Sequence, residues 1–237
     1  MLVRTALVTP FMQNARVLID EATRSGMVID PGGDVEKILP LLQLDGRPLD
    51  DITIYLTHAH LDHAGGVSKV SEYLKKMLGR EPQLLAHRLE RDFRANVSQS
   101  AMMFGLSPND FENVREPDRY LEDGDIVRVG ELSGKVLFTP GHSPGHIALY
   151  FESGPVTLAA WEAQPKPLQL ECPVLIGGDL LFQGSVGRTD LPGGDGETLI
   201  HSVVHKVFVL PEDTRVLAGH GGDTTVGVEK HTNPFFQ

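Results

Sequence analysis

The sequence predicts an α+β protein in which a mixed β-sheet arrangement packs against helices. Short apolar runs punctuated by glycine alternate with segments of helical period, which indicates alternating strands and helices. Several expected strands follow one another directly, which favours hairpin partners over a purely parallel sheet. Of the 237 residues, 41% are hydrophobic and 22% are charged, which is ordinary for a globular chain. A chain of this size buries enough surface for a core, and we expect a single domain over residues 1–237.

The apolar periods predict the individual elements in chain order. Residues 51–57 are rich in β-branched side chains, as a buried strand requires. Residues 65–80 carry apolar side chains at 67, 70, 74 and 77, which is helical spacing. A helix over 34–44 begins at Asp34, although Pro40 interrupts its pattern. A third helix is expected at 196–208, whereas 88–119 shows only helical fragments. The other strands are expected at 5–10, 14–20, 26–33, 83–87, 125–130, 135–141, 147–152, 173–178 and 214–219.

Composition excludes several classes of function. The formal net charge is −11, and an acidic chain is a poor general binder of nucleic acid or anionic membranes. Cys172 is the single cysteine and can form no internal disulfide, which fits a reducing compartment. No stretch has the features of a secretory signal or is long enough to span a bilayer, so we expect a cytoplasmic protein. The sequence does not set its oligomeric state.

One segment departs from the regular alternation. Residues 152–173 contain several prolines and the single tryptophan, Trp161. We expect an insertion there, in the form of a hairpin or flap between two core strands. Met102, Met103 and Phe104 are expected to belong to the core or to a pocket wall.

The densest cluster of metal-ligand side chains follows the strand expected at 51–57. It contains His58, His60, Asp62 and His63. Four buried polar side chains are costly unless they are satisfied. Imidazole nitrogens and carboxylate oxygens suit zinc, iron or manganese. On an extended backbone His58 and His60 point to the same side, and Asp62 and His63 could then face a second metal.

Three later strands end in the same way. His142, Asp179 and His220 each follow an apolar run and a glycine. Glycine lets the backbone turn sharply and approach a ligand closely. A single histidine at a strand end is more often structural, but the recurrence favours a metal site. The seven donors are enough for two metals with four ligands each, if one carboxylate bridges.

These residues resemble the motifs of the metallo-β-lactamase superfamily in order and spacing along nearly the whole chain. The resemblance implies a four-layer αββα sandwich, with two mixed sheets flanked by helices and metals at one edge between the sheets. It also implies how the donors divide. One metal would be held by His58, His60 and His142, and the other by Asp62, His63 and His220, with Asp179 as the bridge.

Two further stretches, 141–146 and 184–190, are similar to those of short bacterial glyoxalase II-like enzymes, the hydroxyacylglutathione hydrolases. This resemblance implies a hydrolase that cleaves S-(2-hydroxyacyl)glutathione with a metal-bound hydroxide, which Asp62 would orient. One or two divalent ions are expected, zinc first, with iron or manganese as alternatives. The C-terminal helical domain that helps longer members hold glutathione is not expected here.

Two residues have expected supporting roles. Glutathione carries two carboxylates, so its site needs fixed positive groups, and Arg188 offers a bidentate fork. The resemblance implies that Arg188 contacts the glutathione moiety; the alternative is an ion pair with Asp190 that only fixes the loop. His146 is expected to pack under the metal loops or to hydrogen-bond a ligand, rather than to bind metal itself.

Two other functions remain open from the sequence. Persulfide dioxygenases resemble this chain closely and would use one iron, held by His58, His142 and Asp179, to oxidise glutathione persulfide with O₂. Two histidines and one carboxylate with open positions are the pattern of iron oxygenases. The other possibility is a binding module that metal only stabilises, which the complete set of donors disfavours.

Overall fold

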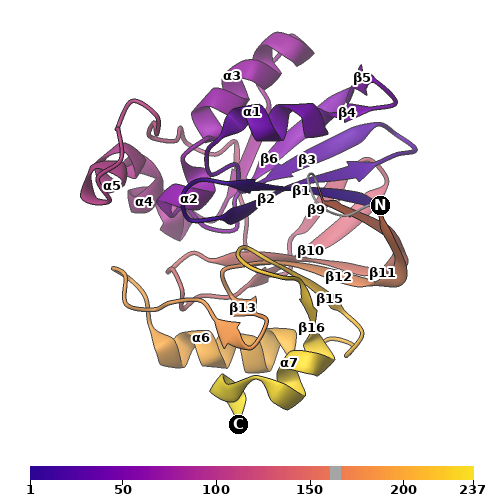
Figure 1. Ribbon diagram of the computed structural model, residues 1–237, viewed down its shortest axis with the longest axis vertical. Coiled ribbons are helices and arrows are strands. Elements are labelled where there is room, and N and C mark those ends of the chain that lie inside the picture. Colours follow the sequence, from indigo (N-terminus) through magenta and orange to yellow (C-terminus); the bar gives the residue numbers. More distant parts are fainter. Residues whose placement is uncertain (161–166) are drawn as a thin grey trace.

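The computed structural model describes residues 1–160 and 167–237 and arranges them in four layers (Figure 1). Helices α1 (Val35–Ile38) and α3 (Val67–Leu78) cover one outer face. Helices α6 (Gly196–Ser202) and α7 (Val226–Thr232) cover the opposite face, and two β-layers lie between. The expected α+β sandwich with mixed sheets is confirmed.

The first β-layer is built from the N-terminal half. Strands β1 to β3 pair antiparallel in order, and β6, β7 and β8 extend the layer in parallel. Its strands are β1 (Leu2–Val8), β2 (Gln13–Asp20), β3 (Ser25–Ile29), β6 (Asp51–Tyr55), β7 (Gln83–Ala86) and β8 (Arg119–Tyr120).

The second β-layer is built from the C-terminal half. Strands β9 to β12 pair antiparallel in order, β15 adds in parallel to β12, and β16 closes the edge. The long β11 also pairs in parallel with β1, so a seam of backbone hydrogen bonds joins the layers. The strands are β9 (Ile126–Val129), β10 (Leu132–Phe138), β11 (Ile147–Ala160), β12 (Leu168–Gly178), β15 (Arg215–Ala218) and β16 (Thr224–Thr225).

Three apolar clusters fill the spaces between the four layers. In β2, Val17 packs toward the helices while Leu18 packs toward the second β-layer. In β12, Val174 faces the first β-layer, while Leu175 contacts the cluster beneath α6 and α7. Because successive side chains of a strand point to opposite faces, this division requires both β-layers to be covered on both sides. The near-continuous apolar runs of these strands follow from that double burial.

The remaining elements are short. The helix expected at 34–44 divides into α1 and a 3₁₀ turn because Pro40 lacks an N–H and cannot continue the α-helix. The π-helical turn η3 (Val203–Val207) continues α6 over the segment expected as one helix. The others are α2 (Leu61–Ala64), α4 (Arg91–Ala95), α5 (Val97–Met103), the 3₁₀ turns η1 (Leu39–Leu42), η2 (Arg88–Glu90) and η4 (Pro234–Phe236), and the strand pairs β4 (Gln43–Leu44) with β5 (Arg47–Pro48) and β13 (Leu181–Phe182) with β14 (Ser185–Val186).

The segment expected as an insertion, 152–173, lies mostly on the outer parts of β11 and β12. These parts pair with each other, and residues of β11 from Thr157 onward also pair with β1. Trp161 lies outside the described residues. No helix among the described residues is long and apolar enough to cross a membrane.

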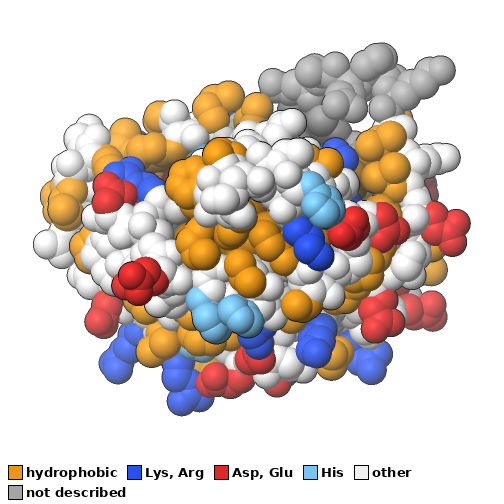
Figure 2. Space-filling model, turned by 90° about the horizontal axis from the view of Figure 1, so that it is seen from below, with side chains coloured by type: hydrophobic (Ala, Val, Ile, Leu, Met, Phe, Trp, Pro, Cys, Tyr) orange, Lys and Arg blue, Asp and Glu red, His pale blue; other side chains and the backbone are white. Residues whose placement is uncertain are grey.

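The face covered by α6 and α7 carries a gathering of apolar side chains near its middle (Figure 2). Exposed apolar residues on or beside its helical elements are Val204, Val209, Val228 and Phe235. This surface belongs to the outer helical layer, separate from the strand ends that carry the metal-ligand side chains.

Candidate metal centre

Strand ends and one short helix bring the seven predicted donors to one edge between the two β-layers. His58 follows β6, Asp179 follows β12 and His220 follows β15. His142 lies in the loop between β10 and β11, and α2 carries Asp62 and His63 directly after His60. The N-terminal and C-terminal halves therefore both supply donors to the same site.

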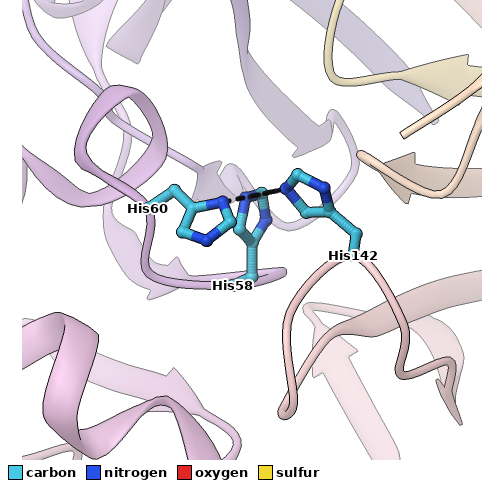
Figure 3. Close-up of side chains that lie close together, drawn as sticks. All are labelled: His58, His60 and His142. Atoms are coloured by element: carbon cyan, nitrogen blue, oxygen red, sulfur yellow. Dashed lines mark hydrogen bonds between the residues drawn. The ribbon is translucent and has the colours of Figure 1, made fainter. Parts of the chain in front are cut away.

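The first group consists of three imidazoles whose nitrogens converge. His58, His60 and His142 point toward one another from two loops (Figure 3). Nε2 of His142 lies 2.9 Å from Nδ1 of His60 and 3.1 Å from Nε2 of His58. Burial and the neighbouring histidines lower the pKa of His58 well below its ordinary value, and burial and His142 lower the pKa of His60 to about 3. Neutral imidazoles with converging lone pairs fit a cation.

The second group combines imidazoles with a carboxylate. Nε2 of His220 lies 3.1 Å from Oδ2 of Asp62 and 3.4 Å from Nε2 of His63. Although burial opposes the charge, the carboxylates of Asp179, Asp62 and Asp30 raise the pKa of His63 well above its ordinary value. These three donors could hold a second ion.

Asp179 lies between the two groups. Its Oδ1 is 3.3 Å from Nε2 of His63, and its Oδ2 is 3.4 Å from Nε2 of His220 and 3.6 Å from Nε2 of His142. Although burial opposes ionisation, His63 and the other imidazoles lower the pKa of Asp179. Its buried Oδ1 has no hydrogen-bond partner among the described residues, which is costly without a cation. The donor set therefore fits one ion in each group with Asp179 reaching both.

Backbone carbonyls and hydroxyls hold several of the rings in place. Nδ1 of His142 lies 2.7 Å from the carbonyl oxygen of Arg188, and Nδ1 of His220 lies 3.1 Å from that of Phe11. A hydrogen on each Nδ1 leaves the Nε2 lone pair free for a metal. His146 is buried, and its Nδ1 lies 2.9 Å from Oγ1 of Thr139. The His146 ring packs 5.3 Å from that of His58, beside the first group.

Sequence reasoning missed Asp30, which holds His63. Its Oδ2 lies 2.9 Å from Nδ1 of His63, and its two oxygens accept hydrogen bonds from the backbone N–H and hydroxyl of Thr57. Asp30 thus orients His63 and fixes the residue before His58. A signal was available, because Asp30 also stands where an apolar strand meets a glycine-rich turn.

Sequence reasoning also missed Glu90, a buried carboxylate that connects two ligand loops. Its Oε2 accepts the backbone N–H of Ala59 at 2.7 Å, between His58 and His60. Its Oε1 accepts the Ser143 hydroxyl and the Gly145 N–H, each at 2.7 Å, beside His142. Burial raises the pKa of Glu90. The carboxylate therefore fixes the distance between the loops that carry the first group.

Replacing Glu90 with glutamine is expected to weaken metal binding by about 10- to 100-fold, the usual effect of losing a residue that orients ligands. The glutamine amide turns one acceptor into a donor, which opposes either the Ala59 N–H or the Ser143 and Gly145 donors. Competition with a chromophoric chelator measures the affinity. Glu81→Gln, at a half-exposed carboxylate remote from the site, is the control. Unchanged affinity in a folded Glu90→Gln protein would contradict this role.

A cavity of about 490 Å³ opens over the donors. Arg188 lines it, and its Nε and Nη2 contact the two oxygens of Asp190, each at 2.7 Å. The ion pair considered from the sequence is thus present, and Arg188 also remains at the cavity wall. Met103 and Phe104, expected in the core or a pocket wall, line this cavity.

Residues 8–160 match the family model described as "Metallo-beta-lactamase superfamily". Hydroxyacylglutathione hydrolase GloC of Haemophilus influenzae is 33% identical over 96% of this chain and 94% of its own. The crystal structure of TTHA1623 in a di-iron-bound form is 34% identical, with a TM-score of 0.75 and 98% of each chain covered. That of the BLEG-1 B3 metallo-β-lactamase is 32% identical, with a TM-score of 0.78 and 99% of each chain covered.

The converging donors and the matching family model define a protein of a metallo-hydrolase superfamily, with clustered side chains that could hold metal ions. The chain belongs to the metallo-β-lactamase superfamily. Its His/Asp cluster and the di-iron-bound neighbour support the use of divalent metal ions.

Proposed function

We propose that this protein is a thioester hydrolase of the glyoxalase II-like subgroup, which cleaves S-(2-hydroxyacyl)glutathione to a 2-hydroxy acid and glutathione. The observation that carries the proposal is the position of Asp179 between two groups of metal-ligand side chains. The similarity to GloC supports the choice of substrate.

The proposed ligands are His58, His60 and His142 for one ion and Asp62, His63 and His220 for the other, with Asp179 shared. Divalent ions supply a hydroxide near neutral pH, by lowering the pKa of bound water to about 7, and polarise the substrate carbonyl. Zinc is our first assignment, with iron or manganese as alternatives. The neutral first group and the anionic Asp62 and Asp179 favour a cation, whereas binding at the second group requires His63 to give up the proton that the nearby carboxylates favour.

The side chains of the site need only bind and orient the reactants. Ions held by these ligands would supply the hydroxide whose oxygen adds to the thioester carbonyl carbon, and the C–S bond would break in return. The glutathione thiolate leaves as a stable anion, so the step needs little acid assistance. Asp62 holds the attacking oxygen through its carboxylate, and no side-chain nucleophile takes part. Cys172 is buried in β12 and does not line the cavity, so its thiol does not act as the nucleophile.

Metal analysis paired with three assays tests this function. The expected result is two divalent ions per chain and hydrolysis of S-lactoylglutathione, measured as released thiol. One iron per chain, with oxygen uptake when glutathione persulfide is added, would instead support the persulfide dioxygenase hypothesis. Hydrolysis of a β-lactam without hydrolysis of the thioester would contradict the proposal. The β-lactam assay is included because this chain is similar to the BLEG-1 B3 metallo-β-lactamase.

Replacing Arg188 with alanine is expected to raise KM for S-lactoylglutathione by about 10-fold or more, because a hydrogen bond to a charged group is worth about 1.5–3 kcal/mol. Turnover should change much less, since the guanidinium binds the glutathione moiety rather than the reacting carbon. Asp190→Ala is the matched variant, because it frees the guanidinium from its ion pair and should not raise KM. An unchanged KM in Arg188→Ala would show that Arg188 only fixes the loop.

A further inference from the structure

The cavity over the metal centre has an apolar wall that includes several aromatic rings. Its floor is formed by five of the proposed metal ligands. Apolar residues make up much of the remaining lining, and four of them are phenylalanines. These are Phe11, Phe93, Phe104 and Phe182.

Two of the aromatic rings pack against metal-ligand histidines, one in each donor group. The Phe93 ring lies 5.1 Å from that of His60 at 82°, and the Phe182 ring lies 6.1 Å from that of His220 at 76°. A thioester carbonyl held above the donors would place its acyl substituent within reach of these rings.

The other two phenylalanines form the rim. Their rings contact edge to face at 5.5 Å and 77°. Phe104 is 51% exposed and its neighbour Met103 is 81% exposed. Contiguous exposed apolar side chains beside a cavity mark a ligand site more often than a random surface does. The Phe11 carbonyl also contacts Nδ1 of His220, which fixes this part of the rim relative to the donors.

The charge of the lining does not match a whole glutathione molecule. Arg188 is the single cationic residue among the described residues that line the cavity, histidines aside, and Asp190 already pairs with it. One such group can serve one carboxylate of glutathione at a time. The aromatic wall is therefore suited to a different part of the substrate.

We propose that this wall binds the acyl group, and that the protein prefers thioesters whose acyl group carries an aromatic ring or a bulky apolar chain over lactoyl. Burial of such a group against Phe104, Phe93 and Phe182 would contribute binding free energy that the methyl group of lactoyl cannot supply. This inference rests on the proposed thioester hydrolysis and narrows its substrate class.

Competing thioesters with the same leaving group provide the test. On the metal-loaded protein, kcat/KM for S-mandeloylglutathione is expected to exceed that for S-lactoylglutathione by about 10-fold or more. Phe104→Ala should reduce this preference by about 5-fold, because kcat/KM should fall more for the mandeloyl thioester than for the lactoyl thioester. Phe235→Ala removes a similarly exposed ring (55%) in η4, outside the cavity lining, and should leave both values unchanged.

The outcomes separate this inference from the proposed function. Equal values for the two thioesters, or a preference that Phe104→Ala leaves intact, would overturn the inference while hydrolysis stands. If neither thioester is cleaved, the proposed function fails, and calorimetric binding of mandelate and lactate then decides. Tighter binding of mandelate that Phe104→Ala weakens would retain the aromatic site, and equal binding would overturn it.

Discussion

Replacing Asp179 with asparagine is expected to lower thioester hydrolysis by about 10³-fold or more and to reduce the bound metal to about one ion per chain. The substitution keeps the shape of the side chain but removes the negative charge that both donor groups face. The asparagine amide would also turn N–H donors toward imidazole nitrogens. Metal-ion stabilisation is worth several kcal/mol, and each 1.36 kcal/mol is tenfold in rate.

Elemental analysis of dialysed protein and initial rates measure the two effects. Asp50→Asn changes an exposed carboxylate in the first half of the chain and serves as the control, which should keep both metals and full activity. Two tightly bound ions in Asp179→Asn would show that this carboxylate does not join the groups.

Adding one methyl group at Gly219 is expected to lower activity almost as much as Asp179→Asn does. A Cβ at this position would lie 2.1 Å from Oδ1 of Asp179 and 2.9 Å from Cε1 of His63. Both distances are shorter than van der Waals contact, so the carboxylate or the ring must move. We expect Gly219→Ala to lower activity by about 100-fold, because small misplacements of reacting groups cost that much, and to destabilise the fold by about 1–3 kcal/mol.

A matched glycine lies three positions further along. At Gly222 a Cβ would lie 3.1 Å from Oε1 of Gln183, the mobile end of a long side chain. Gly222→Ala should therefore keep its metal content and most of its activity. Thermal unfolding of the metal-free and metal-loaded forms separates the two contributions, since displaced ligands reduce the gain on metal loading. A Gly219→Ala protein with normal metal content would rule out a close approach of this backbone to Asp179.

The sequence could predict which donor side chains converge, because each one follows a recognisable local pattern. An apolar strand, a turn and then an imidazole or carboxylate recur at His142, Asp179 and His220. The strands before them, β10, β12 and β15, run in the same direction and therefore end at the same edge. Asp30 shares part of this pattern, but its carboxylate precedes the glycines and contacts a ligand instead of the cavity. Its role depends on the later placement of His63.

Glu90 could not have been predicted. It lies in a segment without clear period, and its importance arises from loops that lie 31 and 55 residues away in sequence. Of the aromatic wall, Phe104 was expected in the core or a pocket wall, but Phe11, Phe93 and Phe182 were not, because they come from three other elements or turns. The predicted helix over 34–44 was too long, because Pro40 ends the α-helix and a 3₁₀ turn follows.

Backbone hydrogen bonds between β1 and β11 join the two β-layers, and the donors at their edge come from both halves of the chain. His60 and His142 are 82 residues apart, and His63 and His220 are 157 apart. Ions held in the folded protein would act as non-covalent cross-links between segments that are far apart in the sequence. Ligands that bind only the folded state also stabilise it by mass action. Chelation would therefore loosen the junction of the two halves as well as stop the chemistry.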